Sequence, residues 1–135
     1  MSEENVEIVL GWYKAFTRGD IEFILDRVNE DVSWHPANAQ LLGMGAMHGK
    51  ERLRTYFTRD MAEAFTGFTT EAVQVEDLGE NGVLVQSRYE GAGRVSGAPV
   101  RLDTFSLFRF REGKIACFSD YDTRAEALEA AGLSE

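Results

Sequence analysis

The sequence predicts an α+β domain in which helices pack against one curved antiparallel sheet. Apolar residues recur at helical spacing in the first half of the chain, whereas an alternation with a period of two begins at Thr69. The longest apolar stretch, residues 100–121, is broken only by a glycine-containing turn at residues 111–114 and is typical of a β-hairpin. With 135 residues and no internal repeat or linker, residues 1–135 are expected to form a single domain.

Three helices are predicted ahead of the sheet, each from apolar residues that recur every three or four positions. They cover residues 2–18, 21–28 and 49–65. Asp20 is placed to cap the second helix, and Gly49 begins the third. Between these helices, residues 32–35 indicate a short strand, and residues 37–48 have no period and are interpreted as a loop.

Four strands and a short final helix follow. They cover residues 69–77, 83–90, 100–110 and 115–121, with the helix at 124–131. On the long strand the odd positions carry charges such as Arg101 and Asp103, so its even positions are predicted to face the core. The last strand is ambiguous, because Ile115, Cys117 and Tyr121 are more apolar than the even positions between them.

Composition excludes several classes of function. The net charge of −9 argues against a nucleic-acid surface and against binding to an anionic membrane. A single cysteine forbids an intrachain disulfide, and two histidines thirteen positions apart match no metal-ligand spacing, so no metal is expected. No apolar run approaches the roughly 20 residues of a membrane helix, and the acidic N-terminus lacks signal-peptide features. A cytoplasmic location is therefore expected.

Four motifs in this chain resemble those of the nuclear transport factor 2-like (NTF2-like) superfamily. They are Ala15-Phe-Thr-Arg-Gly-Asp20, Val32-Ser-Trp-His-Pro36, Phe108-Arg-Phe-Arg-Glu-Gly-Lys-Ile115 and Asp120-Tyr-Asp122. The sequence is most similar to the SnoaL-like branch, which is related to ketosteroid isomerases, polyketide cyclases and limonene epoxide hydrolases. This resemblance implies a cone-shaped sheet, a cystatin-like roll, whose concave face is covered by the N-terminal helices around an apolar pocket.

Only some of the family's catalytic residues have a counterpart of the same type in this sequence. The three positions of the isomerase groups hold Trp12, His35 and Ser106, none of which is the isomerase residue type, so steroid-type isomerisation is not expected. The acidic residue that cyclases and epoxide hydrolases use on the final strand falls on Asp120, which makes Asp120 the first catalytic candidate. This role requires Phe118 and Asp120 to face inward, and burial to raise the pKa of the carboxyl group.

His35 is the second catalytic candidate, because an imidazole with a pKa of about 6.5 suits proton transfer near neutrality. The alternative is a histidine that pairs with a backbone carbonyl at the end of a strand. The residues expected to bind a ligand are Trp12, Trp34, Tyr56, Ser106, Phe108, Phe118 and Asp122. The alternatives are that the aromatic residues are ordinary core and that Asp122 caps the final helix.

Three functions remain open from the sequence. The first is a cofactor-free enzyme that acts on a small hydrophobic molecule by acid/base proton transfer with Asp120 and His35, as an isomerase, cyclase or hydrolase. The second is a non-catalytic protein that binds a hydrophobic ligand, and the third is a structural dimer with a vestigial pocket. In each case a homodimer through the outer face of the sheet is expected, because that face carries an apolar set. The set is Phe105, Leu107, Ile115, Cys117 and Tyr121.

Overall fold

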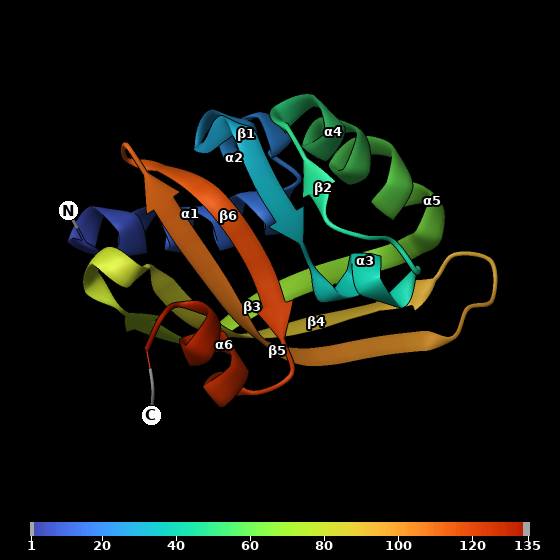
Figure 1. The fold of residues 1–135 in the computed structure, drawn as a ribbon. Coiled ribbons are helices and arrows are strands. Elements are labelled where there is room, and N and C mark those ends of the chain that lie inside the picture. Colours follow the sequence, from blue (N-terminus) through green and yellow to red (C-terminus); the bar gives the residue numbers. More distant parts are fainter. Residues whose placement is uncertain (1, 134–135) are drawn as a thin grey trace.

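Helices dominate the first half of the chain and strands the second half in the computed structural model, which describes residues 2–133 (Figure 1). The helices are α1 (Ser2–Arg18), α2 (Ile21–Asp26), α3 (Ala37–Leu41), α4 (Lys50–Thr55), α5 (Met61–Ala64) and α6 (Arg124–Ala130), with a π-helical turn at Tyr56–Asp60 and a 3₁₀ turn at Gly79–Asn81. The strands are β1 (Val28–His35), β2 (Met47–His48), β3 (Phe65–Asp77), β4 (Val83–Gly93), β5 (Pro99–Arg111) and β6 (Lys114–Tyr121). The α+β class predicted from the sequence is confirmed.

The strands form one sheet in the order β2-β1-β6-β5-β4-β3. Strands β3 to β6 are antiparallel neighbours, as predicted. Strand β1, however, runs parallel to β6, which makes the sheet mixed rather than wholly antiparallel. A parallel pair requires a long connection, and the chain supplies one, because all of β2 to β5 lies between these two strands.

The loop predicted for residues 37–48 was wrong in part, because it contains α3 and β2. A helix of five residues is too short to show a period, and β2 is only two residues that pair with β1. The third helix begins after Gly49 as predicted but ends at Ala64. Strand β3 then starts at Phe65, earlier than expected, because a register shift opposite β4 hides the alternation at its beginning.

The two faces of the sheet are covered by different helices, with α1 behind it and α6 in front of it in Figure 1. On β5 the even positions Thr104, Ser106 and Phe108 are buried on the side of α1, as predicted. On the other face, α6 packs on Leu84 and Leu107. Part of the apolar outer face is therefore covered by the chain's own last helix, and this part needs no second subunit.

A β-bulge resolves the ambiguity of the last strand. Phe110 pairs with Ile115 while Arg109 pairs with Cys117, so Ala116 is an extra residue on β6. The bulge reverses the alternation, and Ile115, Phe118 and Asp120 therefore all face the interior. The expectation that Ile115 lies on the outer face was wrong for this reason.

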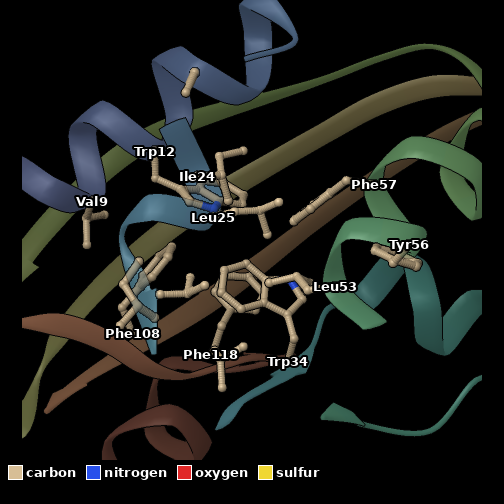
Figure 2. Packing of buried hydrophobic residues seen from close by; sticks show 14 of the residues in the cluster. Val9, Trp12, Ile24, Leu25, Trp34, Leu53, Tyr56, Phe57, Phe108 and Phe118 are labelled. Atoms are coloured by element: carbon tan, nitrogen blue, oxygen red, sulfur yellow. The ribbon is translucent and has the colours of Figure 1, made fainter. Parts of the chain in front are cut away.

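Aromatic side chains fill much of the space between the sheet and the helices (Figure 2). Trp34 of β1 stacks on Phe118 of β6 with ring centroids 4.4 Å apart, and Phe108 of β5 meets Phe118 edge-on at 4.8 Å. Trp12 reaches the same cluster from α1, with its ring centroid 5.8 Å from that of Trp34. These rings form the wall against which the candidate site is built.

Candidate functional site

The side chain of Asp120 is buried on the inner face of β6 and only 7% exposed. It accepts hydrogen bonds from the backbone N–H of Ala37 at 2.8 Å, the hydroxyl of Tyr89 at 3.0 Å, Thr104 Oγ1 at 3.1 Å and Ser106 Oγ. Within residues 2–133, no basic side chain lies within ion-pair distance of this carboxylate. Three hydroxyl groups and one backbone amide therefore stabilise the carboxylate of Asp120, in the place that a basic side chain would otherwise take.

The sheet register explains why these groups meet. Ser106 lies directly opposite Asp120 on β5, and Thr104 is the next inward position on the same strand. Tyr89 reaches the carboxylate from β4, two strands away. Ala37 is the first residue of α3, where the backbone N–H has no partner within the helix and is free to bind an anion.

A chain of hydroxyl groups continues from Ser106 toward α1. Ser106 Oγ lies 2.8 Å from Ser87 Oγ, and Ser87 Oγ lies 2.5 Å from the hydroxyl of Tyr13. Each hydroxyl has one proton, and Ser106 donates its proton to Asp120. Ser106 must therefore accept from Ser87, and Ser87 from Tyr13. This order directs every proton of the chain toward an ionised carboxylate.

Burial raises the pKa of Asp120 above its ordinary value, and the donors around the carboxylate oppose this shift. The pKa of Tyr89 is raised well above that of a free tyrosine, first by burial and then by the negative charge of Asp120. Tyr89 therefore keeps its proton at neutral pH and donates it to Asp120. The hydroxyl of Tyr89 also lies 3.3 Å from Ser106 Oγ, but the single proton of Ser106 is donated to Asp120. The oxygen of Tyr89 therefore accepts no hydrogen bond among the described residues.

Tyr89 connects the carboxylate to a small interior cavity. The volume of this cavity is about 10 Å³, close to the space that one water molecule requires. Its aromatic walls include Trp12, Trp34 and Phe118, and its polar lining comes from Tyr89 and Asn38. In place of the apolar pocket expected from the sequence, the surrounding side chains leave a space that about one water molecule would fill. Asp120 lies behind Tyr89 and does not line the cavity.

The ligand-binding residues predicted from the sequence fall into three groups. Trp12, Trp34 and Phe118 line the cavity. Tyr56, Phe108 and Ser106 are buried nearby, the first two in the hydrophobic core and the third in the hydroxyl chain.

Asp122 forms the third group, because it is exposed beyond the end of β6. It does not cap α6, since Thr123 does so in a capping box with Glu126.

The register of the sheet directs the two predicted catalytic side chains to opposite faces, although both residues border one surface hollow. His35 pairs in register with Ser119, while the inward positions beside them are Trp34 and Phe118. His35 and Asp120 therefore lie on opposite faces of the sheet. The surface hollow that His35 borders has a volume of about 270 Å³, and its lining also includes Gln40, Asp120 and Asp122. His35 does not line the interior cavity.

Sequence reasoning missed Tyr13, Ser87, Tyr89 and Thr104 as parts of the site. The available signal was that polar residues occupy inward positions on two adjacent strands, where apolar residues are the rule. On α1, the hydroxyl that reaches the network belongs to Tyr13 and not to the neighbouring Trp12.

Residues 2–133 contain no cluster of three or more His, Cys, Asp or Glu side chains that could hold a metal ion. Among the same residues, none of the helices is both long and apolar enough to span a membrane.

Comparison with known proteins identifies the family. The model of the SnoaL-like domain matches residues 9–118, so the chain belongs to the SnoaL-like family within the NTF2-like superfamily. A comparison with curated proteins found no match.

Solved structures share the fold at low sequence identity. An NTF2-like protein of unknown function from Burkholderia pseudomallei is 23% identical with a TM-score of 0.77, over 93% of this chain and 95% of that chain. A candidate SnoaL-like polyketide cyclase from Jannaschia is 19% identical with a TM-score of 0.73, over 96% and 92%. An epoxide hydrolase of the LEH-like type from M. tuberculosis is 15% identical with a TM-score of 0.71, over 96% and 90%. At these identities the comparison establishes the fold alone.

Proposed function

We propose that the protein is a cofactor-free enzyme that transfers a proton on a small hydrophobic molecule, as an isomerase or cyclase. The observation that carries this proposal is the pair of Tyr89 and Asp120, a cavity-lining hydroxyl backed at 3.0 Å by a buried carboxylate without a basic partner among the described residues. The similarity to a candidate polyketide cyclase agrees with it.

The proposed reaction is a proton relay through Tyr89. A C–H or O–H bond of the substrate breaks, its electron pair stays on the substrate, and the proton passes to the oxygen of Tyr89. The phenolic proton of Tyr89 moves to Asp120 in the same step, so that no phenolate accumulates. Reversal of the relay returns a proton to the same atom or to another one. His35 takes no part, because it lies on the other face of the sheet.

Burial raises the pKa of Asp120, and a higher pKa makes its carboxylate a stronger proton acceptor at the end of such a relay. A general base contributes about 10²- to 10⁴-fold to a rate. Asp120→Asn removes the proton acceptor and keeps the size of the side chain. We therefore expect this substitution to slow proton transfer by at least about a hundredfold.

Exchange of hydrogen for deuterium tests proton transfer without knowledge of the product. The substrate probe is 2-tetralone in D₂O, and NMR records the loss of its α-protons. The wild type should accelerate exchange over buffer, Asp120→Asn should not, and the exposed Asp103→Asn should behave as the wild type. Equal rates for wild type and Asp120→Asn would overturn the relay.

A non-catalytic binding protein is the second candidate, and the saturation of Asp120 favours it. Four groups already donate to this carboxylate, which is a common state for a structural anchor. One experiment distinguishes the two candidate functions. A binding protein would change its tryptophan fluorescence with 2-tetralone and leave the exchange rate at that of buffer.

A further inference from the structure

A proton relay that ends at Asp120 also needs contact with solvent. A proton taken from a substrate must leave Asp120 before the next turnover, and exchange with deuterium in the solvent requires the same contact. The interior cavity is poorly suited to this task, because its volume of about 10 Å³ is close to that of one water molecule and a bound substrate would occupy it. Asp120 must therefore meet water somewhere else.

Two of the paths that lead away from Asp120 end inside the protein. The hydroxyl chain through Ser106 and Ser87 stops at Tyr13, which is buried. Thr104 is buried as well, and its hydroxyl makes no second hydrogen bond among the described residues. Neither path brings the carboxylate to the surface.

A third path leads to the surface hollow of about 270 Å³, which we term the polar hollow. Besides Asp120, its lining consists of His35, Gln40, Ser119, Tyr121, Asp122 and Glu126. Asp120 lines this hollow and not the interior cavity, so the 7% of the residue that is exposed faces the hollow. Because every lining side chain carries a polar group, the hollow is a favourable place for water.

Helix α3 joins the carboxylate to the polar hollow. The backbone N–H of Ala37, its first residue, binds Asp120 Oδ2 at 2.8 Å. Gln40 of the same helix lines the hollow, and its Nε2 donates to the carbonyl oxygen of His35 at 3.3 Å and to that of Asp120 at 3.5 Å. Both of these bonds are longer than the usual range, and Gln40 is exposed. Its amide is therefore a loosely held cover beside Asp120.

The geometry of Tyr89 allows protons to cross from one side of Asp120 to the other. Its hydroxyl lies 3.2 Å from Oδ1 and 3.0 Å from Oδ2 of the carboxylate. A hydronium ion in the hollow can protonate one carboxylate oxygen. That proton then passes to the oxygen of Tyr89 while the phenolic proton moves to the other carboxylate oxygen. Each O–H bond that breaks is replaced by one that forms, and Tyr89 thereby exchanges its proton with solvent.

We propose that the polar hollow is the solvent end of the relay, through which protons enter and leave Asp120, and that Gln40 is a positioning residue that restricts this exchange. The proposal rests on the proposed function insofar as Tyr89 and Asp120 form the relay. The exchange needs only water, so His35, which borders the same hollow, remains outside it.

Exchange of the Tyr89 hydroxyl proton tests this path on the full chain without any substrate. In a mixture of H₂O and D₂O, the Cζ resonance of isotope-labelled tyrosine reports how fast the hydroxyl proton exchanges. The chain has four tyrosines, and Tyr89→Phe assigns the signal. The indole N–H of Trp12 is the internal reference for opening of the core, because it is buried and has no partner among the described residues.

The first pair of variants places a ring inside or outside the hollow. Ser119 lines the polar hollow, whereas Ser33 is half-buried on the same face of the neighbouring strand and does not line it. We expect Ser119→Phe to slow the exchange of Tyr89 by at least about tenfold, which corresponds to about 1.4 kcal/mol in the barrier. Ser33→Phe should stay within about twofold of the wild type. No slowing in Ser119→Phe, or equal slowing in both variants, would overturn the path.

The second pair of variants removes the cover and does not depend on the folding of Ser119→Phe. Gln40→Ala should accelerate the exchange of Tyr89 by at least about tenfold and leave the indole N–H of Trp12 unchanged. Gln74→Ala, at an exposed glutamine outside the hollow, should change neither rate. An unchanged rate for Tyr89 in Gln40→Ala, or equal acceleration of Tyr89 and Trp12, contradicts the proposal. These rates are measured without substrate, so the path can hold where catalysis fails, and the two proposals fail separately.

Discussion

The burial of Asp120 should make the free energy of unfolding depend on pH. Burial raises the pKa of this carboxyl group from its ordinary value of 3.8. The folded protein therefore binds the proton more tightly than the unfolded chain does. Linkage requires that the contribution of Asp120 to stability is fully present below about pH 3.8 and declines as the pH rises to the folded pKa. Each unit by which the pKa is raised corresponds to about 1.4 kcal/mol of this decline.

Asp120→Asn isolates the effect, because asparagine does not titrate. The free energy of unfolding should be measured by urea denaturation of both proteins at several values between pH 4 and pH 8. We expect the variant to gain about 1.4 kcal/mol relative to the wild type for each unit of pKa elevation, and then a constant difference. A constant offset from lost hydrogen bonds does not affect this slope.

The control is Asp103→Asn. Asp103 is exposed on the outer face, and Arg88, 3.0 Å away, holds the pKa of its carboxyl group below the ordinary value. The stability that this pair contributes is complete above about pH 4 and is lost only as the pH falls further. Its difference from the wild type should therefore be flat between pH 4 and pH 8. Parallel profiles of wild type and Asp120→Asn over the same range would refute the reasoning about burial.

Three further predictions concern the parts that position the site. Ser106→Ala removes a donor to Asp120 and should lower the free energy of unfolding at pH 7 by about 2 kcal/mol, and by less at pH 4, in urea titrations. Gly82→Ala should cost roughly 3 kcal/mol in the same assay, because φ is +117° there and a Cβ would lie 2.3 Å from the carbonyl oxygen of Phe108; a loss below 1 kcal/mol would contradict this. Thr123→Ala should cost about 1 kcal/mol through the lost helix cap, whereas Thr123→Ser should be nearly neutral, and equal losses would refute the cap.

The arrangement of helices and strands could be predicted from periodicity, and α1 has the predicted bounds. The inward side of β5 was also predictable, because the charges on its odd positions exclude the alternative. The inward side of β6 was not, since the bulge at Ala116 depends on pairing with β5 and changes the alternation without any mark in the sequence. The parallel pairing of β1 with β6 could not be predicted either, because pairing between distant strands leaves no local pattern in the sequence.

The candidate site could be predicted only in part. Asp120 was found through a resemblance, and its burial now gives that choice a physical basis. Tyr89 was not found, because its role depends on reaching across β5 to a carboxylate 31 positions away in the chain. His35 was a reasonable candidate by chemistry, and only the register of β1 against β6 shows that it faces the other way.

A double-mutant cycle on deuterium exchange tests the relay most directly. Tyr89→Phe, Asp120→Asn and the variant with both changes should be compared with the wild type for the α-protons of 2-tetralone. Because the two residues act in one step, we expect each single variant to lose nearly all of the acceleration and the double variant to lose no more, within about twofold. Losses that multiply independently, or a Tyr89→Phe protein as fast as the wild type, would contradict a relay from the cavity through Tyr89 to Asp120.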